Sequence, residues 1–244
     1  MRIRAVFFDF QDTIAQFRAG ELPAEVANSA YGLYIEAARS LGVDLDPASV
    51  ALPTEQAWAD FQTPEGPVHV QGSSDETSFQ SVRIAVHRRR LAKAGITGAL
   101  ADDIGRRIDA LEGDPSRYEV FEDVAPALDA LGQDGVRRII VSNHVWHLDR
   151  IVAELGLAQS FEAIVNSARV GYRKPHPAIY RAALEQSGVP AAETVMVGDS
   201  LGHDVRGAER QGIHGVLLDR AGTHVKVEGV RVVRTLTEVP LQWP

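Results

Sequence analysis

Strand-length apolar runs alternate with helical segments in the second half of the chain, and this alternation narrows its possible folds most. The apolar runs lie at 136–141, 161–165, 194–197 and 214–218. The segments with three-to-four apolar spacing lie at 123–133, 146–155, 177–187 and 201–211. Strands that alternate with helices of this length predict a parallel sheet covered by helices on both faces.

The first half of the chain has a different pattern. An apolar run at 3–8 predicts one more buried strand, which ends at Asp9. From about residue 20 to residue 115 the spacing is helical, with a stretch 63–74 that predicts a loop. The helical signals are Val26, Ala30, Leu33, Ala37 and Leu41, then the segments 54–62, 75–94 and 99–112. The sequence therefore predicts an α/β, doubly wound, Rossmann-like core of residues 1–16 and 116–244, with an all-α cap inserted at 17–115.

Composition excludes several classes of function. The formal net charge of −8 argues against a nucleic-acid groove, which needs clustered excess Lys and Arg. Cysteine is absent, so disulfides, thiolate metal sites and thiol nucleophiles are excluded. No apolar run approaches the roughly 20 residues of a membrane span, and the first residues lack the apolar core of a signal peptide. We expect a cytoplasmic protein with neither nucleic-acid nor membrane partners.

Four short polar stretches carry the chemistry. They are Asp9-Phe10-Gln11-Asp12-Thr13, Ser142-Asn143, Lys174-Pro175, and Gly198-Asp199-Ser200 with Asp204. Asp9, Ser142 and Asp199 each come at or just past the end of an expected strand, so all three should meet at the carboxyl rim of the sheet, where such folds bind ligands. Carboxylates held close together repel unless a cation lies between them, and hard oxygen ligands suit Mg²⁺. The four stretches together predict a site for phosphate and magnesium.

Each stretch alone has a simpler explanation. Asp199 and Ser200 could cap the following helix, and Lys174-Pro175 could lie in a solvated loop. The neighbouring His144, His176 and His203 are loop histidines of a kind that is usually solvated or capping. The ordered set is far more specific than any of its members.

In that order the stretches resemble the motifs of the haloacid dehalogenase superfamily of aspartate-dependent hydrolases. The cap inserted after the first motif is similar to the helical cap of the phosphoglycolate phosphatase and β-phosphoglucomutase branch. The Asp-x-x-Asp-Thr loop looks like that of a less-studied subgroup. The resemblance implies a hydrolase that acts on a small phosphorylated molecule, as a monomer or homodimer.

The resemblance also implies a role for each residue. Asp9 would attack phosphorus and form an aspartyl-phosphate, and Lys174 would hold the nucleophile and the phosphate together. The implied Mg²⁺ ligands are Asp9, the Gln11 backbone carbonyl, Asp199 and Asp204, the last directly or through water. The implied phosphate-binding residues are Ser142, Asn143 and Thr13, of which Thr13 would also order the first loop.

Position 11 departs from the family pattern. Phosphatases of this family usually carry Asp there, which protonates the leaving alcohol and then activates water. Gln11 can orient a water molecule but cannot deliver a proton at neutral pH, and loss of a general acid–base typically costs about 10²- to 10⁴-fold in rate. Asp12 is a possible substitute acid–base, or else a turn residue that ties down the loop.

Three functions are therefore open. The first is a slow or narrow-specificity Mg²⁺-dependent phosphohydrolase. The second is a 2-haloacid dehalogenase, because halide departs without a proton, although such enzymes work without a metal. The third is a non-catalytic binding protein on the same scaffold. In the cap, Tyr31, Trp58 and Phe61 are apolar candidates for substrate contacts, whereas the arginine run 88–90 is more typical of a solvated helix face.

Overall fold

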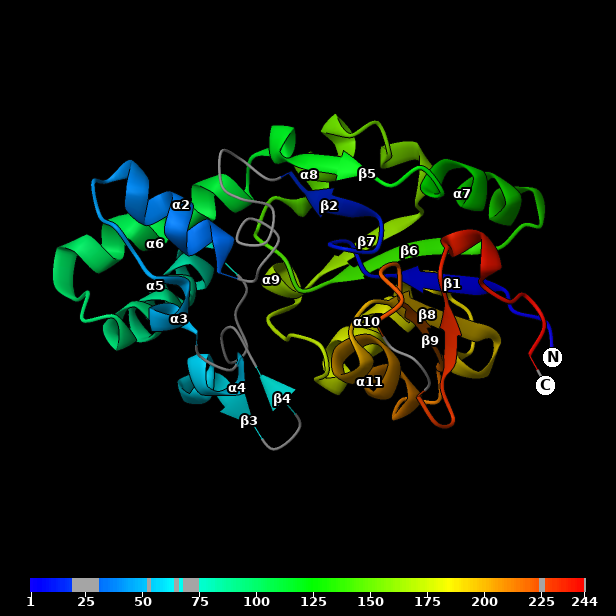
Figure 1. Ribbon diagram of the computed structural model, residues 1–244. Helices are drawn as coiled ribbons and strands as arrows, with labels where there is room; N and C mark the ends of the chain where they lie inside the picture. The colour runs from blue at the N-terminus through cyan, green and yellow to red at the C-terminus, as the bar shows by residue number, and fades with distance from the viewer. Residues whose placement is uncertain (19–30, 52–53, 64–65, 68–74, 224–226, 244) are drawn as a thin grey trace.

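A six-stranded parallel sheet forms the core of the molecule (Figure 1). The computed structural model describes residues 1–18, 31–51, 54–63, 66–67, 75–223 and 227–243. In the spatial order β10-β9-β8-β1-β6-β7, the strands span Arg231–Val233, His214–Leu218, Thr194–Gly198, Ala5–Phe8, Arg137–Ser142 and Ala163–Asn166. The predicted doubly wound α/β core is confirmed.

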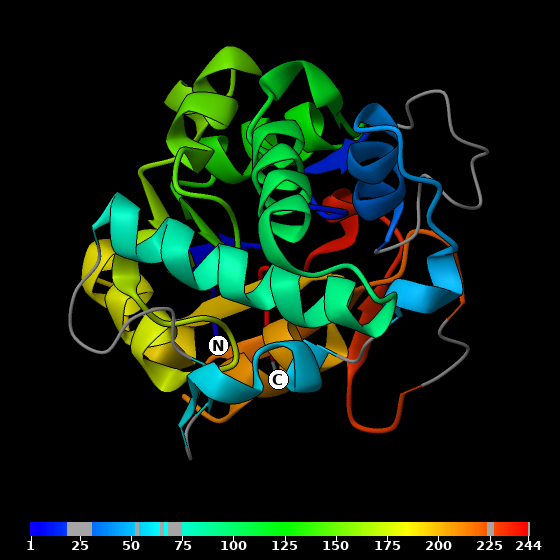
Figure 2. The ribbon, with the colours of Figure 1, turned by 90° about the vertical axis from the view of Figure 1, so that its left-hand side faces the viewer.

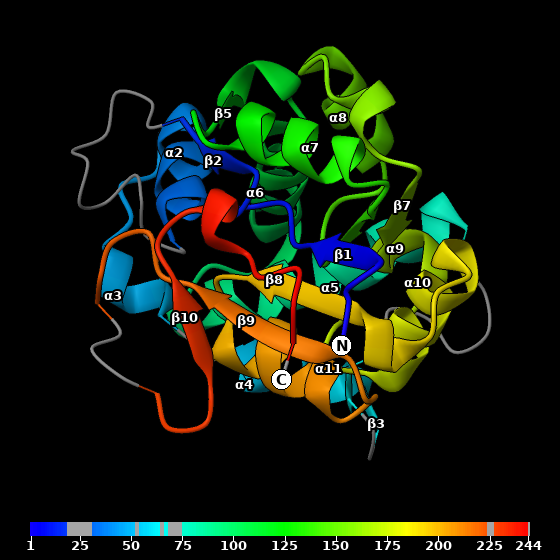
Figure 3. The same ribbon diagram turned by 90° about the vertical axis from the view of Figure 1, so that its right-hand side faces the viewer.

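Helices cover both faces of this sheet, so its central strand β1 is apolar at every position. Val6 and Phe8 belong to an apolar cluster with residues of α7 and α8, whereas Phe7 belongs to a cluster with residues of α10 and α11. Figure 3 shows these two pairs of helices on opposite faces of the sheet. These helices span Val124–Gln133, Leu148–Glu154, Pro177–Ser187 and Gly207–Glu209. The predicted helix at 201–211 begins as a π-helix, η5, at Leu201–Arg206.

The insertion after the first strand is a helical cap, seen face-on in Figure 2. Its helices are α2 (Gly32–Ser40), α3 (Pro47–Val50), α4 (Thr54–Ala57), the 3₁₀ turn η1 (Ala59–Phe61), α5 (Glu76–Lys93) and α6 (Gly98–Glu112). Tyr34, Leu91, Ile104 and Ile108 form the centre of its own apolar cluster. The predicted helices at 75–94 and 99–112 are confirmed to within one residue at each end.

Other expectations for the cap met mixed outcomes. The segment 54–62 divides into α4 and η1 rather than forming one helix. Gln62, expected at the end of that helix, begins β3 (Gln62–Thr63), which pairs with β4 (Gly66–Pro67) inside the expected loop, so the loop prediction was wrong at residues 63 and 66–67. Two residues of the first helical pattern, Val26 and Ala30, lie outside the described residues.

A two-stranded antiparallel ribbon lies where the chain leaves and re-enters the core. It joins β2 (Ala15–Phe17) to β5 (Tyr118–Val120), which follows the turn η2 (Pro115–Arg117). Neither strand was predicted, because three residues are too few to display a period of two. The ribbon lies close to the expected boundaries between cap and core, which themselves stay a prediction.

The remaining short elements are η3 (Ala158–Ser160), α9 (Ser167–Val170), η4 (Ala191–Glu193) and η6 (Leu236–Glu238). Among the helices that the structure describes, none combines the length and the apolar character that a membrane crossing requires.

Candidate functional site

Three acidic side chains meet at the carboxyl rim of the sheet. Asp9 follows β1 and Asp199 follows β8, and the two strands are in register with Phe8 opposite Val197. The Asp9 amide donates a hydrogen bond to the Val197 carbonyl, 3.0 Å away. Asp204, from η5, completes the group, and each of the three carboxylates offers an oxygen within 4.8 Å of the others. The rim expected from strand order is therefore present.

Lys174 lies between two of these carboxylates. Its Nζ is 2.8 Å from Asp9 Oδ1 and 2.5 Å from Asp204 Oδ1. Burial alone would lower the pKa of Lys174, but the charges of Asp204 and then Asp9 raise it above its usual value. Lys174 is therefore a fixed ammonium ion, with only 2% of its side chain exposed.

Asn143 holds the backbone of Lys174 in place. Its Nδ2 donates to the Lys174 carbonyl at 3.0 Å, and its Oδ1 accepts from the Lys174 amide at 2.7 Å. The Lys174-Pro175 peptide bond is cis. Ser142, the last residue of β6, is buried, and its hydroxyl has no hydrogen-bond partner among the residues that the structure describes. Asn143 thus positions the lysine through its side chain, a role that the sequence did not reveal.

The turn after β8 is built around the Asp204 carboxylate. Asp204 Oδ2 accepts a hydrogen bond from the Ser200 amide at 2.9 Å, while Ser200 Oγ accepts from the His203 amide at 3.3 Å. The expected capping role of Ser200 is therefore confirmed. A Cβ at Gly198 would overlap the Asp204 carboxylate, which explains why only glycine fits there.

Crowded negative charge perturbs two of these carboxyl groups. Asp204 is completely buried, and this burial, with Asp9 adding to it, raises its pKa to about 6 despite the opposing charge of Lys174. Asp199 stands at the exposed edge of the rim. Desolvation of its carboxyl group and the charges of Asp9 and Asp204 raise its pKa to about 8. Such carboxylates are stabilised by a bound cation.

The first loop turns sharply after the sheet. Asp12 is exposed and adopts a left-handed backbone conformation with φ of 58°, and its amide donates to the Ala15 carbonyl at 2.8 Å. Desolvation and then the charge of Asp9 raise the pKa of Asp12. Thr13 is fully buried beneath the loop, and its Oγ1 finds no partner in the described part of the chain. The burial of Thr13 agrees better with ordering of the loop than with phosphate contact.

Arg220, which the sequence did not single out, supports this loop from the side. It donates to the Thr13 carbonyl at 2.6 Å and pairs with Asp123 at 3.0 Å. A cavity of about 430 Å³ opens here, and Asp12, Asp199 and Arg220 lie in its wall. A larger cavity of about 640 Å³ lies between α5 and α6, and none of the predicted site residues is among the described residues that line it.

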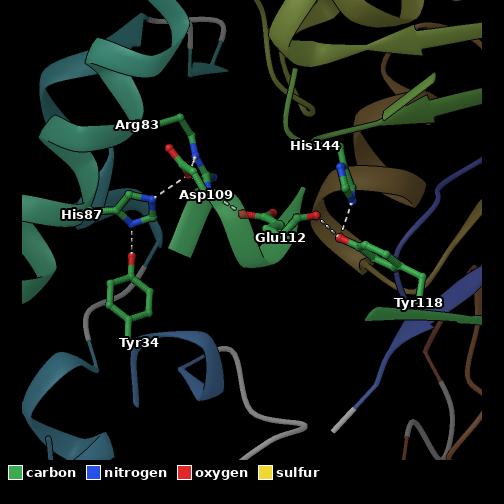
Figure 4. Close-up of polar contacts among 7 residues, drawn as sticks. All are labelled: Tyr34, Arg83, His87, Asp109, Glu112, Tyr118 and His144. Carbon is green, nitrogen blue, oxygen red and sulfur yellow. Dashed lines mark hydrogen bonds and ion pairs between the residues drawn. The ribbon is translucent and has the colours of Figure 1, made fainter. Parts of the chain in front are cut away.

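A chain of buried polar contacts runs through the cap toward the core (Figure 4). Tyr34 lies 2.7 Å from His87 Nδ1, and His87 Nε2 lies 3.1 Å from Asp109 Oδ1. Arg83 donates from Nε to Asp109 at 2.9 Å and also pairs with Glu112. Although burial would raise it, the pKa of Asp109 is lowered to about 2 by Arg83 and His87.

This series of polar contacts ends at His144, beside the site. Tyr118 donates its hydroxyl proton to the Glu112 carbonyl at 2.8 Å, so it accepts from His144 Nε2 at 3.1 Å. His144 therefore carries its proton on Nε2, and its Nδ1 has no partner among the described residues. Burial lowers the pKa of His144 to about 4, so the ring is neutral. The expectation of a solvated or capping histidine was wrong here.

Elsewhere the simpler interpretations hold. His176 Nδ1 accepts from the Ala178 amide at 3.1 Å and so caps α10. Arg88 and Arg89 form partly exposed ion pairs with acidic residues of the cap, as expected of a solvated helix face. Trp58, in contrast, is buried and lies over Arg173, with its ring centroid 4.1 Å from the guanidinium carbon.

Known proteins share this chain's sequence and fold. A family model described as a haloacid dehalogenase-like hydrolase matches residues 3–212. The haloacid dehalogenase-like hydrolase domain-containing protein 3 of Danio rerio is 28% identical, over 98% of this chain and 95% of that protein. The glyceraldehyde 3-phosphate phosphatase of Methanopyrus kandleri is 29% identical, over 89% and 84%. The magnesium-bound HAD-hydrolase YfnB of Bacillus subtilis has a TM-score of 0.67 at 20% identity, over 98% and 97%. These matches confirm the superfamily resemblance.

Proposed function

The chain belongs to the haloacid dehalogenase-like hydrolases, and on that premise we propose that it is a Mg²⁺-dependent phosphohydrolase of a small phosphorylated molecule. The observation that carries the proposal is the placement of Lys174 between Asp9 and Asp204, with Asp199 beside them. A similar protein of Methanopyrus kandleri bears the name glyceraldehyde 3-phosphate phosphatase, which agrees with a substrate of that size.

Asp9 is the nucleophile in this proposal. An oxygen of its carboxylate attacks phosphorus, the bond from phosphorus to the ester oxygen breaks, and an aspartyl-phosphate and an alcohol result. Water then attacks the phosphorus, which releases inorganic phosphate and restores Asp9. Lys174 keeps the Asp9 carboxylate oriented and offsets the negative charge of the incoming phosphoryl group. Ser142, with its free hydroxyl, and the Asn143 backbone bind phosphoryl oxygens.

The carboxylates suit Mg²⁺. Asp9 and Asp199 present hard oxygen ligands whose mutual repulsion a divalent cation would relieve. Both Asp204 oxygens already accept hydrogen bonds, one from Lys174 and one from the Ser200 amide, which favours support through water. The Gln11 carbonyl is the fourth ligand implied by the family. The bound ion would shield the charge of the phosphoryl group as the carboxylate approaches.

Gln11 makes the enzyme slow or narrow in specificity, because it cannot protonate a leaving alcohol. Asp12 is only a partial substitute for the missing acid–base in our proposal. Its exposed carboxyl group stands in the wall of the 430 Å³ cavity together with Asp199, so a leaving group in that cavity would be within its reach.

Two finer assignments are part of the same proposal. The helical insertion between β1 and β5 supports the phosphoglycolate phosphatase and β-phosphoglucomutase branch, with residues 17–115 as the cap. The Asp9-Phe10-Gln11-Asp12-Thr13 loop supports the subgroup with an Asp-x-x-Asp-Thr motif. Action as a monomer or homodimer and a cytoplasmic location stay predictions.

The two other functions are weaker alternatives. A 2-haloacid dehalogenase would tolerate Gln11, but it would have no use for the metal-adapted carboxylates Asp199 and Asp204. A non-catalytic binding protein would have no reason to keep a buried lysine against Asp9.

A release assay tests the proposal. The wild type and Asp9→Asn are incubated with alkyl phosphates, aryl phosphates and 2-haloacids, with Mg²⁺ or with EDTA. We expect phosphate release only from the wild type with Mg²⁺, and no halide. Halide release that EDTA leaves intact would assign the dehalogenase function instead. No release of either product would favour the binding protein.

A further inference from the structure

The guanidinium of Arg173 lies at the junction between cap and core without a charged partner. Arg173 directly precedes Lys174, and its carbonyl accepts from the His176 amide at 2.7 Å. Its guanidinium faces the Trp58 ring of the cap. Among the described residues, no side chain forms a hydrogen bond or ion pair with that guanidinium. A half-buried, unpaired guanidinium is costly to keep, because it has lost water without gaining acceptors.

The acidic groups near Arg173 already have other partners. Glu112, whose charge acts on Arg173, is bound to Arg83, as Figure 4 shows. Asp9 is bound to Lys174. Burial first, and then the positive charge of Arg83, lower the pKa of Arg173 to about 9. The surroundings of Arg173 therefore favour an additional anion.

We propose that Arg173 binds a second anionic group of the substrate, a carboxylate or a second phosphate, while the first phosphoryl group lies against Asp9. Asp9 is among the charges that act on the Arg173 guanidinium, so a phosphoryl group held at Asp9 lies within electrostatic reach of Arg173. The planar guanidinium matches carboxylate and phosphate oxygens through paired N–H groups. Stacking on Trp58 fixes the plane of that fork in advance. This inference rests on the proposed phosphohydrolase function and names its substrate class.

Three phosphonates of equal length provide the test, since they bind without turnover. They are propylphosphonate, 3-phosphonopropionate and ethylene-1,2-bisphosphonate, titrated calorimetrically into the wild type with Mg²⁺. Charge-assisted hydrogen bonds predict that one or both of the probes with a second anionic group bind about 10- to 100-fold more tightly than propylphosphonate. The tighter of the two identifies the anion as carboxylate or phosphate.

Variants then assign the preference to one side chain. In Arg173→Gln the preference should fall to about threefold or less. Arg173→Lys keeps the charge but loses the fork, so it should retain an intermediate preference and show that loss of folding is not the cause. Arg88→Gln removes a largely exposed arginine on α5 of the cap and should keep the full preference.

Each contrary result has its own meaning. Equal binding of all three probes by the wild type would overturn the inference and leave the phosphoryl site intact. A preference that survives in Arg173→Gln would also overturn it, because another residue would then bind the second anion. If none of the probes bound, the phosphoryl site itself would fail and the inference with it.

Discussion

His144 offers a quantitative test of how the site is supported, because its ring is buried, neutral and bonded to Tyr118. In the unfolded chain this histidine takes up a proton near its usual pKa of 6.5, whereas in the folded protein it does so only near 4. The unfolded state therefore binds more protons between these values. The stability that the neutral ring contributes is complete above pH 6.5 and is lost as the pH falls through this window.

The size of this loss follows from the two pKa values. Each pKa unit corresponds to about 1.4 kcal/mol, so lowering the pH from about 7.5 to about 5 costs roughly 2 kcal/mol from His144 alone. In a chain of this length that loss lowers Tm by about 4–8 °C. His87, whose pKa burial also lowers, acts in the same direction.

Asp199 and Asp204 act in the opposite direction. Their raised pKa values of about 8 and about 6 mean that the folded metal-free protein holds protons that the unfolded chain releases. Their contribution is present at low pH and is lost as the pH rises through those values. A single pH profile therefore mixes both effects, and only a comparison of variants isolates His144.

Urea unfolding of the metal-free proteins at about pH 7.5 and about pH 5 makes that comparison. His144→Gln keeps a donor for Tyr118 but has no titrating ring, so its pH-dependent loss should be about 2 kcal/mol smaller than that of the wild type. His147→Gln, which alters a largely exposed histidine nearby, should behave as the wild type does. An equal loss in wild type and His144→Gln would refute the argument that His144 is buried as a neutral ring.

Three further predictions concern the chemical site. Gln11→Asp should raise turnover of alkyl phosphates by up to about 10²-fold and of aryl phosphates by less. Equal rates for Gln11→Asp and the wild type on both kinds of substrate would count against the view that proton transfer is missing. Lys174→Met should lower the free energy of unfolding by about 3–5 kcal/mol, because two carboxylates lose their shared cation; a change below about 1 kcal/mol in denaturant titration would contradict this. Mg²⁺ at about 100 times its Kd should stabilise the fold by about 2.7 kcal/mol, with a larger rise in Tm at about pH 8 than at about pH 5.5, since protons compete for Asp199; a rise that is independent of pH would speak against this ligand set.

The sequence predicted the convergence of the rim but not the contacts that fix it. Asp9 and Asp199 could be placed together because strand ends of a parallel sheet share one edge. The two hydrogen bonds from the Asn143 side chain to the Lys174 backbone join residues 31 positions apart, and no local sequence pattern reveals such a pair. The contact of His144 with Tyr118 of β5 likewise joins residues that are 26 positions apart in the chain.

The sequence patterns also could not predict the shortest strands or the ion pairs between different helices. The strands β2 and β5 have only three residues each, too few to separate alternation from chance. Arg83 lies on α5, the helix that carries the arginine run, yet it is the buried partner of Asp109 and Glu112 whereas Arg88 is largely exposed. Helical periodicity predicts which residues share a face of α5. It does not predict which of them will meet the acidic residues of α6.

Acid-quenched peptide mass spectrometry of the wild type during turnover tests the central claim, that Asp9 forms a covalent phosphoryl intermediate. The protein is mixed with an aryl phosphate and Mg²⁺, quenched, and digested. The account predicts that the peptide containing Asp9 gains the mass of one phosphoryl group, that the gain disappears with EDTA, and that Asp9→Asn never shows it. Steady phosphate release with a phosphoryl group on another residue would contradict the account.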